Sequence, residues 1–247
     1  MTASFTRRKA LRRAAFITAA AAAGSHLLAV PGHAAGRDPV PEPPRESAER
    51  LRRRAESVLT GERSANGWEM EKLADGHGHV YTRPVPGVPV RVQVRLGDAE
   101  AVLVHLIRRF HYEIDELRAG DVVGWRAPGT VRRNLPASNQ ASGTAVQIRP
   151  GHYPAGARGG FFPHQQLVVR DMLAELGGVV RWGADDRRPD ESLFYLDVPP
   201  GDTRLPELAA RIRAWTRIPG QGAGTPVDVM APRRRSAAVS LERRQKL

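Results

Sequence analysis

A short polar segment, residues 138–147, limits the fold of this chain more strongly than any other feature. It reads SNQASGTAVQ, so small residues recur at fixed spacings among hydroxyl and amide side chains. Apolar and polar residues then alternate, which predicts a strand over 145–149. In that strand Val146 and Ile148 point to one face and Gln147 to the other. The segment therefore combines a tight polar turn with a half-buried strand.

Two further motifs follow the next predicted helix. Trp182 begins the sequence WGADD, and Asp190 begins the sequence DESLF. The apolar runs at 179–182 and 193–198 predict two strands that flank these polar residues. The turn that joins the two strands contains acidic residues, basic residues and a proline.

Together these segments resemble the zinc D-alanyl-D-alanine carboxypeptidases and related cell-wall endopeptidases. The motifs of that family run S-x-H-x-x-G-x-A-x-D, then W-G-x-D followed by D-x-x-H-F. The positions that agree are Ser138, Gly143, Ala145, Trp182, Gly183, Asp185, Asp190 and Phe194. The three metal-ligand positions instead hold Gln140, Gln147 and Leu193. The resemblance covers residues from roughly 90 to 197, less than half of the chain.

These three substitutions decide the expected chemistry. A catalytic zinc takes three protein ligands from His, Asp, Glu or Cys and activates a water at its open position. A Gln amide offers only a neutral carbonyl oxygen, and Leu193 offers no ligand atom. We therefore expect no zinc cofactor and no zinc-peptidase activity. Asp190 matches the acidic residue near the third ligand, so it is the candidate catalytic residue, without a metal-bound water to act on.

The resemblance implies a single α+β domain, in which an antiparallel sheet flanked by helices carries the former ligand positions. Leu193 is expected to be buried where the family binds its metal. The remaining polar side chains are expected to line a cleft that binds cell-wall peptide or glycan. The candidate binding residues are Ser138, Asn139, Gln140, Ser142, Thr144, Gln147, Trp182 and Asp185.

Two alternatives from other functional classes remain open. The chain is an active D,D-carboxypeptidase or endopeptidase if His152, His164, Asp185 and Asp190 rebuild a metal site. It is a noncatalytic structural or interaction domain if the groove is closed. A peptide-sized cleft around Gln140 and Gln147 would separate peptide binding from the closed domain. Two imidazoles converging with a carboxylate would favour the hydrolase.

The N-terminus predicts export. Residues 6–12 read TRRKALR, which resembles the twin-arginine export motif, and an Ala-rich apolar stretch follows up to Val30. Small residues before Ala34 predict cleavage there, so 1–34 reads as a signal peptide and 35–46 as a Pro-rich linker. The alternative is an uncleaved membrane anchor, for which the apolar run is short. We expect a secreted or extracytoplasmic protein.

The chain has no cysteine, which excludes disulfides and thiol chemistry.

The formal net charge of +12 is concentrated at the two ends of the chain. Residues 1–34 and 233–247 each contribute +5, which leaves +2 for the residues between them. A nucleic-acid-binding domain would carry its basic residues on the folded surface, so we expect no nucleic-acid partner. Residues 217–247 are predicted to form a flexible basic tail, which either contacts anionic wall polymers or lipid headgroups nonspecifically or is simply solvated.

Hydrophobic periodicity places the other elements. Residues 47–59 predict an amphipathic helix that opens an irregular N-terminal region, 47–89. The peptidase-like domain, 90–216, is predicted to begin with a strand over 90–96 and a helix from Asp98 to Phe110. A short strand is expected within 121–125, and further helices are expected over 165–176 and 205–215.

Overall fold

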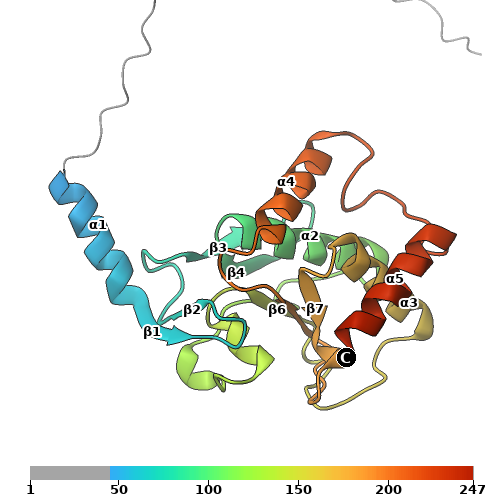
Figure 1. Ribbon diagram of the computed structural model, residues 1–247, viewed down its shortest axis with the longest axis horizontal. Coiled ribbons are helices and arrows are strands. Elements are labelled where there is room, and N and C mark those ends of the chain that lie inside the picture. Colours follow the sequence, from blue (N-terminus) through green and yellow to red (C-terminus); the bar gives the residue numbers. More distant parts are fainter. Residues whose placement is uncertain (1–44, 247) are drawn as a thin grey trace, which may run out of the picture. The chain divides into compact units, whose positions relative to one another are not determined.

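The computed structural model describes residues 45–246, and these belong to one compact unit (Figure 1). The predicted signal peptide (1–34) and residues 35–44 of the predicted linker lie outside the described residues. Within the described part, no helix is long and apolar enough to cross a membrane. Helices and antiparallel sheets alternate along the chain, so the predicted single α+β domain is confirmed.

The central sheet has four antiparallel strands in the order β5-β6-β8-β7. Their bounds are Val122–Val123 for β5, Ala145–Ile148 for β6, Val180–Trp182 for β7 and Leu193–Leu196 for β8. Alternate side chains face opposite sides, as the alternating sequence predicts. One face contributes Val146, Ile148 and Phe194 to the main core, whereas the other carries Ala145, Leu193 and Tyr195 as a separate small cluster.

Helices cover the apolar face of this sheet. Helix α2 (Asp98–Glu113) and α3 (Pro163–Glu175) pack on the sheet and on each other. Phe110 of α2 meets Phe194 edge-on with ring centroids 6.5 Å apart. Helix α4 (Arg204–Arg217) packs against α2, and α5 (Pro232–Gln245) packs against α3 (Figure 1). The opposite face is covered by the short helix η2 (Pro136–Gln140).

Two small sheets precede the central one. Helix α1 (Arg45–Val58) leads into β1 (Leu59–Arg63), which pairs with β2 (Glu69–Glu71). Strand β3 (Val80–Pro84) pairs with β4 (Arg91–Arg95). Short helices η1 (Pro128–Thr130) and η3 (Gly183–Asp185) complete the elements. The strands and helices predicted from hydrophobic periodicity between 90 and 217 are all present, with bounds that shift by at most three residues.

The predicted flexible basic tail is wrong for residues 232–245, because they form helix α5. Leu241 is buried in the main core, and Gln245 Nε2 donates to the carbonyl of Val180 at 3.0 Å. Arg234 donates to Asp171 and Glu175 of α3 at 2.6 Å and 3.0 Å. The prediction treated the arginines as solvated charges, whereas one of them pairs with two acids that lie about 60 residues earlier.

Candidate functional site

The three positions that align with the metal ligands of the resembling family lie together on one face of the central sheet. Gln147 of β6 pairs with Leu193 of β8 and with Val123 of β5. Gln140, the last residue of η2, donates its Nε2 to the carbonyls of Val123 at 3.2 Å and Gly124 at 2.9 Å. The geometry therefore gathers positions that lie far apart in the sequence, as a metal site would require.

The side chains at these positions do not fit zinc. Gln147 donates its Nε2 to Asp190 Oδ2 at 2.9 Å, so its amide is oriented toward a carboxylate. Leu193 is only 2% exposed, so this position is filled by a buried apolar side chain. Across residues 45–246, no group of three His, Cys, Asp or Glu side chains is arranged to hold a metal ion. This donor set supports no step through a metal-bound water.

Asp190, the candidate catalytic residue, is held by other protein groups. Besides the Gln147 amide, its carboxylate accepts from Ser192 Oγ at 2.6 Å and from the backbone N–H of Ser192 at 3.1 Å. It is 8% exposed. Three donors satisfy a buried carboxylate, so Asp190 orients Gln147 and the turn before β8.

The residues that were candidates for a rebuilt metal site have other partners. His152 Nε2 lies 2.9 Å from Arg149 Nη2, and the ring of His164 stacks on Phe162. Both carboxylate oxygens of Asp185 accept from Arg170. These contacts place each group in a different local interaction, so the described residues provide no support for the hydrolase alternative.

The 138–147 segment is buried, and the prediction that its hydroxyls and amides line an open cleft is wrong. Ser138, Asn139, Gln140, Ser142 and Thr144 are each at most 1% exposed, and Gln147 is 8% exposed. Four of them, Ser138, Asn139, Ser142 and Thr144, bond to a turn at 64–66 that sequence reasoning missed. Its composition, SANG over 64–67, is typical of a turn, but no local pattern indicates what it packs on.

Hydrogen bonds join this turn to the buried segment. The backbone N–H of Ala65 donates to Ser138 Oγ at 2.9 Å, and that of Asn66 donates to Asn139 Oδ1 at 3.0 Å. The Asn66 side chain donates to Thr144 Oγ1 and to the carbonyl of Leu196, both at 2.9 Å. We call this set, residues 64–66 with 138–147, the neutral cluster, because it contains no ionisable side chain.

Trp182 and Asp185, two other candidate binding residues, also have structural roles. Trp182 is buried and donates its Nε1 to the carbonyl of Glu191 at 2.7 Å. The guanidinium of Arg170 lies 4.9 Å from the Trp182 ring centroid while it holds Asp185. Gly183 is needed for close approach, because a Cβ there would lie 2.6 Å from the carbonyl oxygen of Asp190.

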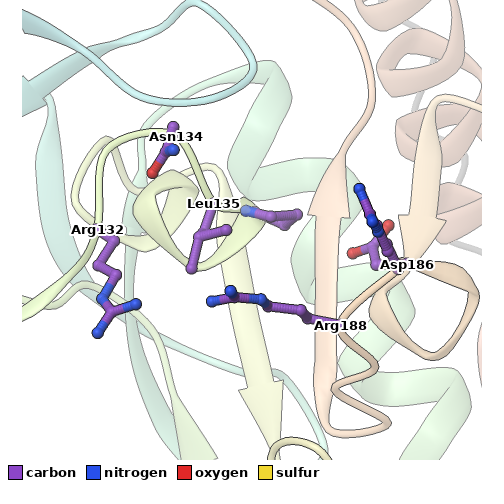
Figure 2. A pocket seen from close by; sticks show the side chains of 7 residues that line it. Arg132, Asn134, Leu135, Asp186 and Arg188 are labelled. Atoms are coloured by element: carbon purple, nitrogen blue, oxygen red, sulfur yellow. The ribbon is translucent and has the colours of Figure 1, made fainter.

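An open groove lies immediately outside Leu193. A pocket of about 410 Å³ has an apolar wall built from Leu135, Pro136, Ala137, Pro189 and Leu193. It shares lining residues with a second hollow of about 650 Å³, lined by Arg132, Asn134, Leu135, Pro136, Asp186, Arg187 and Arg188 (Figure 2). We call the two together the arginine groove. Figure 2 shows Arg188 extending toward Leu135, with Arg132 on the other side of Leu135.

The arginine groove is electropositive. Arg132, Arg187 and Arg188 are exposed, and within residues 45–246 none of them is within ion-pair distance of a carboxylate. Asp186 accepts from the Tyr195 hydroxyl at 2.8 Å and lies 3.3 Å from Arg181 Nε. Burial raises the pKa of Asp186, which further weakens it as a partner for the arginines. Three guanidinium groups therefore remain available to a ligand.

Sequence reasoning missed these arginines. Arg187 and Arg188 stand between the WGADD and DESLF motifs, where they read as part of a surface turn, and Arg132 is one of three arginines between 126 and 133, with no pattern that marks it out. The available signal was a pair of adjacent arginines a few residues before Leu193.

Comparison of the chain with models of protein families, with curated proteins and with solved structures finds no match.

Proposed function

We propose that this chain is an exported, peptidase-like protein of the cell envelope that binds peptidoglycan peptide without hydrolysing it. The observation that carries the proposal is the arginine groove, in which Arg187 and Arg188 line an apolar pocket directly outside Leu193 and Arg132 lines the adjoining hollow. We also propose that the sheet with its 138–147 turn is a zinc carboxypeptidase-like architecture from which the metal site has been lost.

The chemistry of the groove favours a carboxylate-bearing peptide. A guanidinium binds a carboxylate through two parallel hydrogen bonds, which gives both affinity and orientation. The apolar wall of Leu135, Ala137 and Leu193 suits small apolar side chains such as the methyl group of alanine. Uncharged sugars offer the arginines no counter-charge, so we favour peptide over glycan.

The absence of hydrolysis follows from the side chains at the former ligand positions. Leu193 has no ligand atom, and the Gln147 amide is already bonded to Asp190. A peptide in the groove would meet the apolar Leu193 where the resembling family presents a metal. Binding without cleavage is therefore the consequence of this replacement.

The closed structural domain is the second candidate, because the neutral cluster is sealed by the turn at 64–66. It differs from the first candidate in one testable respect: it has no ligand in the arginine groove. The active hydrolase has no support from the described contacts.

Titration calorimetry with D-alanyl-D-alanine and with its C-terminal amide tests the proposal. We expect the free acid to bind and the amide to bind about tenfold more weakly, because a charged hydrogen bond is lost. Arg188→Gln should weaken binding of the free acid by a similar factor. Arg133→Gln is the matched control, since Arg133 is exposed but pairs with Glu62 at 2.9 Å and does not line the groove.

Equal affinity for the acid and the amide would show that the arginines do not recognise the peptide carboxylate. No binding of either peptide would favour the closed structural domain.

A further inference from the structure

The outer face of helix α5 is a second electropositive surface, separate in its residues from the arginine groove. Its inner face is fixed to the body by Arg234, Leu241 and Gln245. The outer face forms a shallow hollow of about 750 Å³ lined by Met230, Pro232, Arg235, Ser236, Val239, Ser240, Arg243 and Arg244. Because the inner contacts fix the helix, this face is presented as a preformed surface.

The charge on this face is of one sign. Arg233, Arg235, Arg243 and Arg244 are exposed, and none of them pairs with a carboxylate within the described part of the chain. Arg244 instead donates to the Ser240 hydroxyl at 3.0 Å. The acid of this helix, Glu242, is partly buried and is engaged by Lys246 at 2.6 Å and by Arg170 at 3.3 Å. The outer face therefore has no counter-charge of its own.

Apolar side chains lie between these arginines. Val239 is 44% exposed and Met230 is 52% exposed, and both line the same hollow as Arg235 and Arg243. Against a soluble polyanion these apolar groups would stay in water. Against a membrane they can enter the headgroup region while the arginines contact anionic lipids.

We propose that the outer face of α5 docks the protein on an anionic phospholipid surface. The arginines supply electrostatic attraction, and Val239 and Met230 add a small apolar contribution. This inference does not depend on peptide binding in the groove. A lipid-docked protein would be held close to the wall precursor or product that the groove is proposed to bind.

Co-sedimentation of the full chain with vesicles tests the inference. Vesicles of phosphatidylglycerol and phosphatidylcholine in equal parts are compared with vesicles of phosphatidylcholine alone. We expect Arg235→Gln with Arg243→Gln to lower the partition coefficient on anionic vesicles by roughly 25-fold, about fivefold per arginine. The matched control is Arg211→Gln with Arg217→Gln, which removes the same charge from exposed positions of α4 and should change binding by less than twofold.

Val239→Ser separates lipid from a soluble polyanion. We expect it to weaken binding to anionic vesicles about threefold and to leave binding to inorganic polyphosphate unchanged. Residues 1–34 are identical in all variants, and Arg235, Val239 and Arg243 are exposed, so thermal unfolding midpoints should match the wild type. Equal effects of the α5 and α4 pairs would overturn the proposal, and so would binding to polyphosphate with no preference for anionic vesicles.

Discussion

The neutral cluster and the interface of α2, α3 and α5 both bury polar side chains, but only the second buries full charges. In the neutral cluster, hydroxyls and amides bond to one another and to the backbone. At the helix interface, Arg109 is 2% exposed and lies among Glu113, Asp171 and Glu175. Arg234 and His105 complete this ion cluster.

The difference shows two ways to fill a polar interior. Neutral groups cost less to desolvate than charges and need only their hydrogen-bond partners, so a short turn can cover Ser138, Asn139 and Thr144. Buried charges cost more and need opposite charges nearby, so the ion cluster recruits Arg234 from the far end of the chain. Apart from the bond between Gln147 and Asp190, the first arrangement should be insensitive to pH, whereas the second should be sensitive to it.

The largest change should come from placing metal-ligand side chains at Gln140, Gln147 and Leu193. The triple substitution Gln140→His, Gln147→Asp and Leu193→His restores the ligand types of the resembling family at three adjacent positions. We expect the apo variant to be less stable than the wild type and zinc to restore roughly 5 kcal/mol or more. Bound zinc is measured by elemental analysis after dialysis, and stability by urea unfolding.

The double substitution Gln140→His with Gln147→Asp is the control for this prediction. It keeps Leu193, so it should retain far less zinc than the triple variant. Stoichiometric zinc in the wild type would contradict the assignment of these positions as lost ligands.

Breaking the ion cluster should be the next most severe change. Asp171→Ala removes the carboxylate that bridges Arg109 and Arg234 and leaves the buried Arg109 with fewer partners. We expect a loss of about 3–5 kcal/mol in the free energy of unfolding. Urea titration at neutral pH measures it, with Glu100→Ala as the control, because the Glu100 pair with Arg83 is more exposed and should be worth less than about 1 kcal/mol. Similar losses in the two variants would show that the ion cluster adds no special stability.

Acid should weaken the ion cluster selectively. Burial alone would raise the pKa of Glu175, but hydrogen bonds from His105 and Arg234 and the charge of Arg109 outweigh it and lower the pKa to about 2. The stabilising contribution is thus present above about pH 4.5, the ordinary value, and is lost as the pH falls toward 2. We expect this one group to account for roughly 3 kcal/mol of acid destabilisation.

Glu175→Gln should be less stable than the wild type at neutral pH and should lose less stability on acidification. Unfolding free energies measured across this pH range test the difference. Parallel curves for the two proteins would show that Glu175 does not carry the pH dependence.

The smallest effect should come from the neutral cluster. Asn66→Ala removes the side-chain hydrogen bonds to Thr144 and to the carbonyl of Leu196, which costs about 1–2 kcal/mol. Because no ionisable group is involved, the loss should be the same at pH 4 as at pH 7. A loss that changes with pH would mean that the cluster is coupled to a titrating group.

The sequence predicts local elements of this chain better than it predicts long-range contacts. The alternation in β6 and the periodicity of α3 place those elements within two residues of their observed bounds, because such patterns depend on neighbouring residues. The burial of Ser138 and Asn139 depends on residues 65 and 66, which lie 73 positions away. Hydrophobic periodicity describes only local structure, so it does not predict this long-range contact.

The same limit applies to charged residues. The sequence predicts that the arginine-rich segment 233–235 is solvated. It does not show that Asp171 and Glu175 lie within reach of Arg234. The groove arginines were missed because their availability depends on Asp186 being held by Tyr195. The resemblance pointed to positions 140, 147 and 193. The arginine groove lies next to Leu193 and is lined mostly by other residues.

The most direct test of peptide binding without cleavage is an NMR titration of the full chain with D-alanyl-D-alanine in the presence of zinc. We predict saturable shifts of the methyl groups of Leu135, Ala137 and Leu193, a dissociation constant on the order of 1 mM or below, and no free D-alanine. Release of D-alanine, or shifts confined to residues outside the arginine groove, would contradict the proposed function.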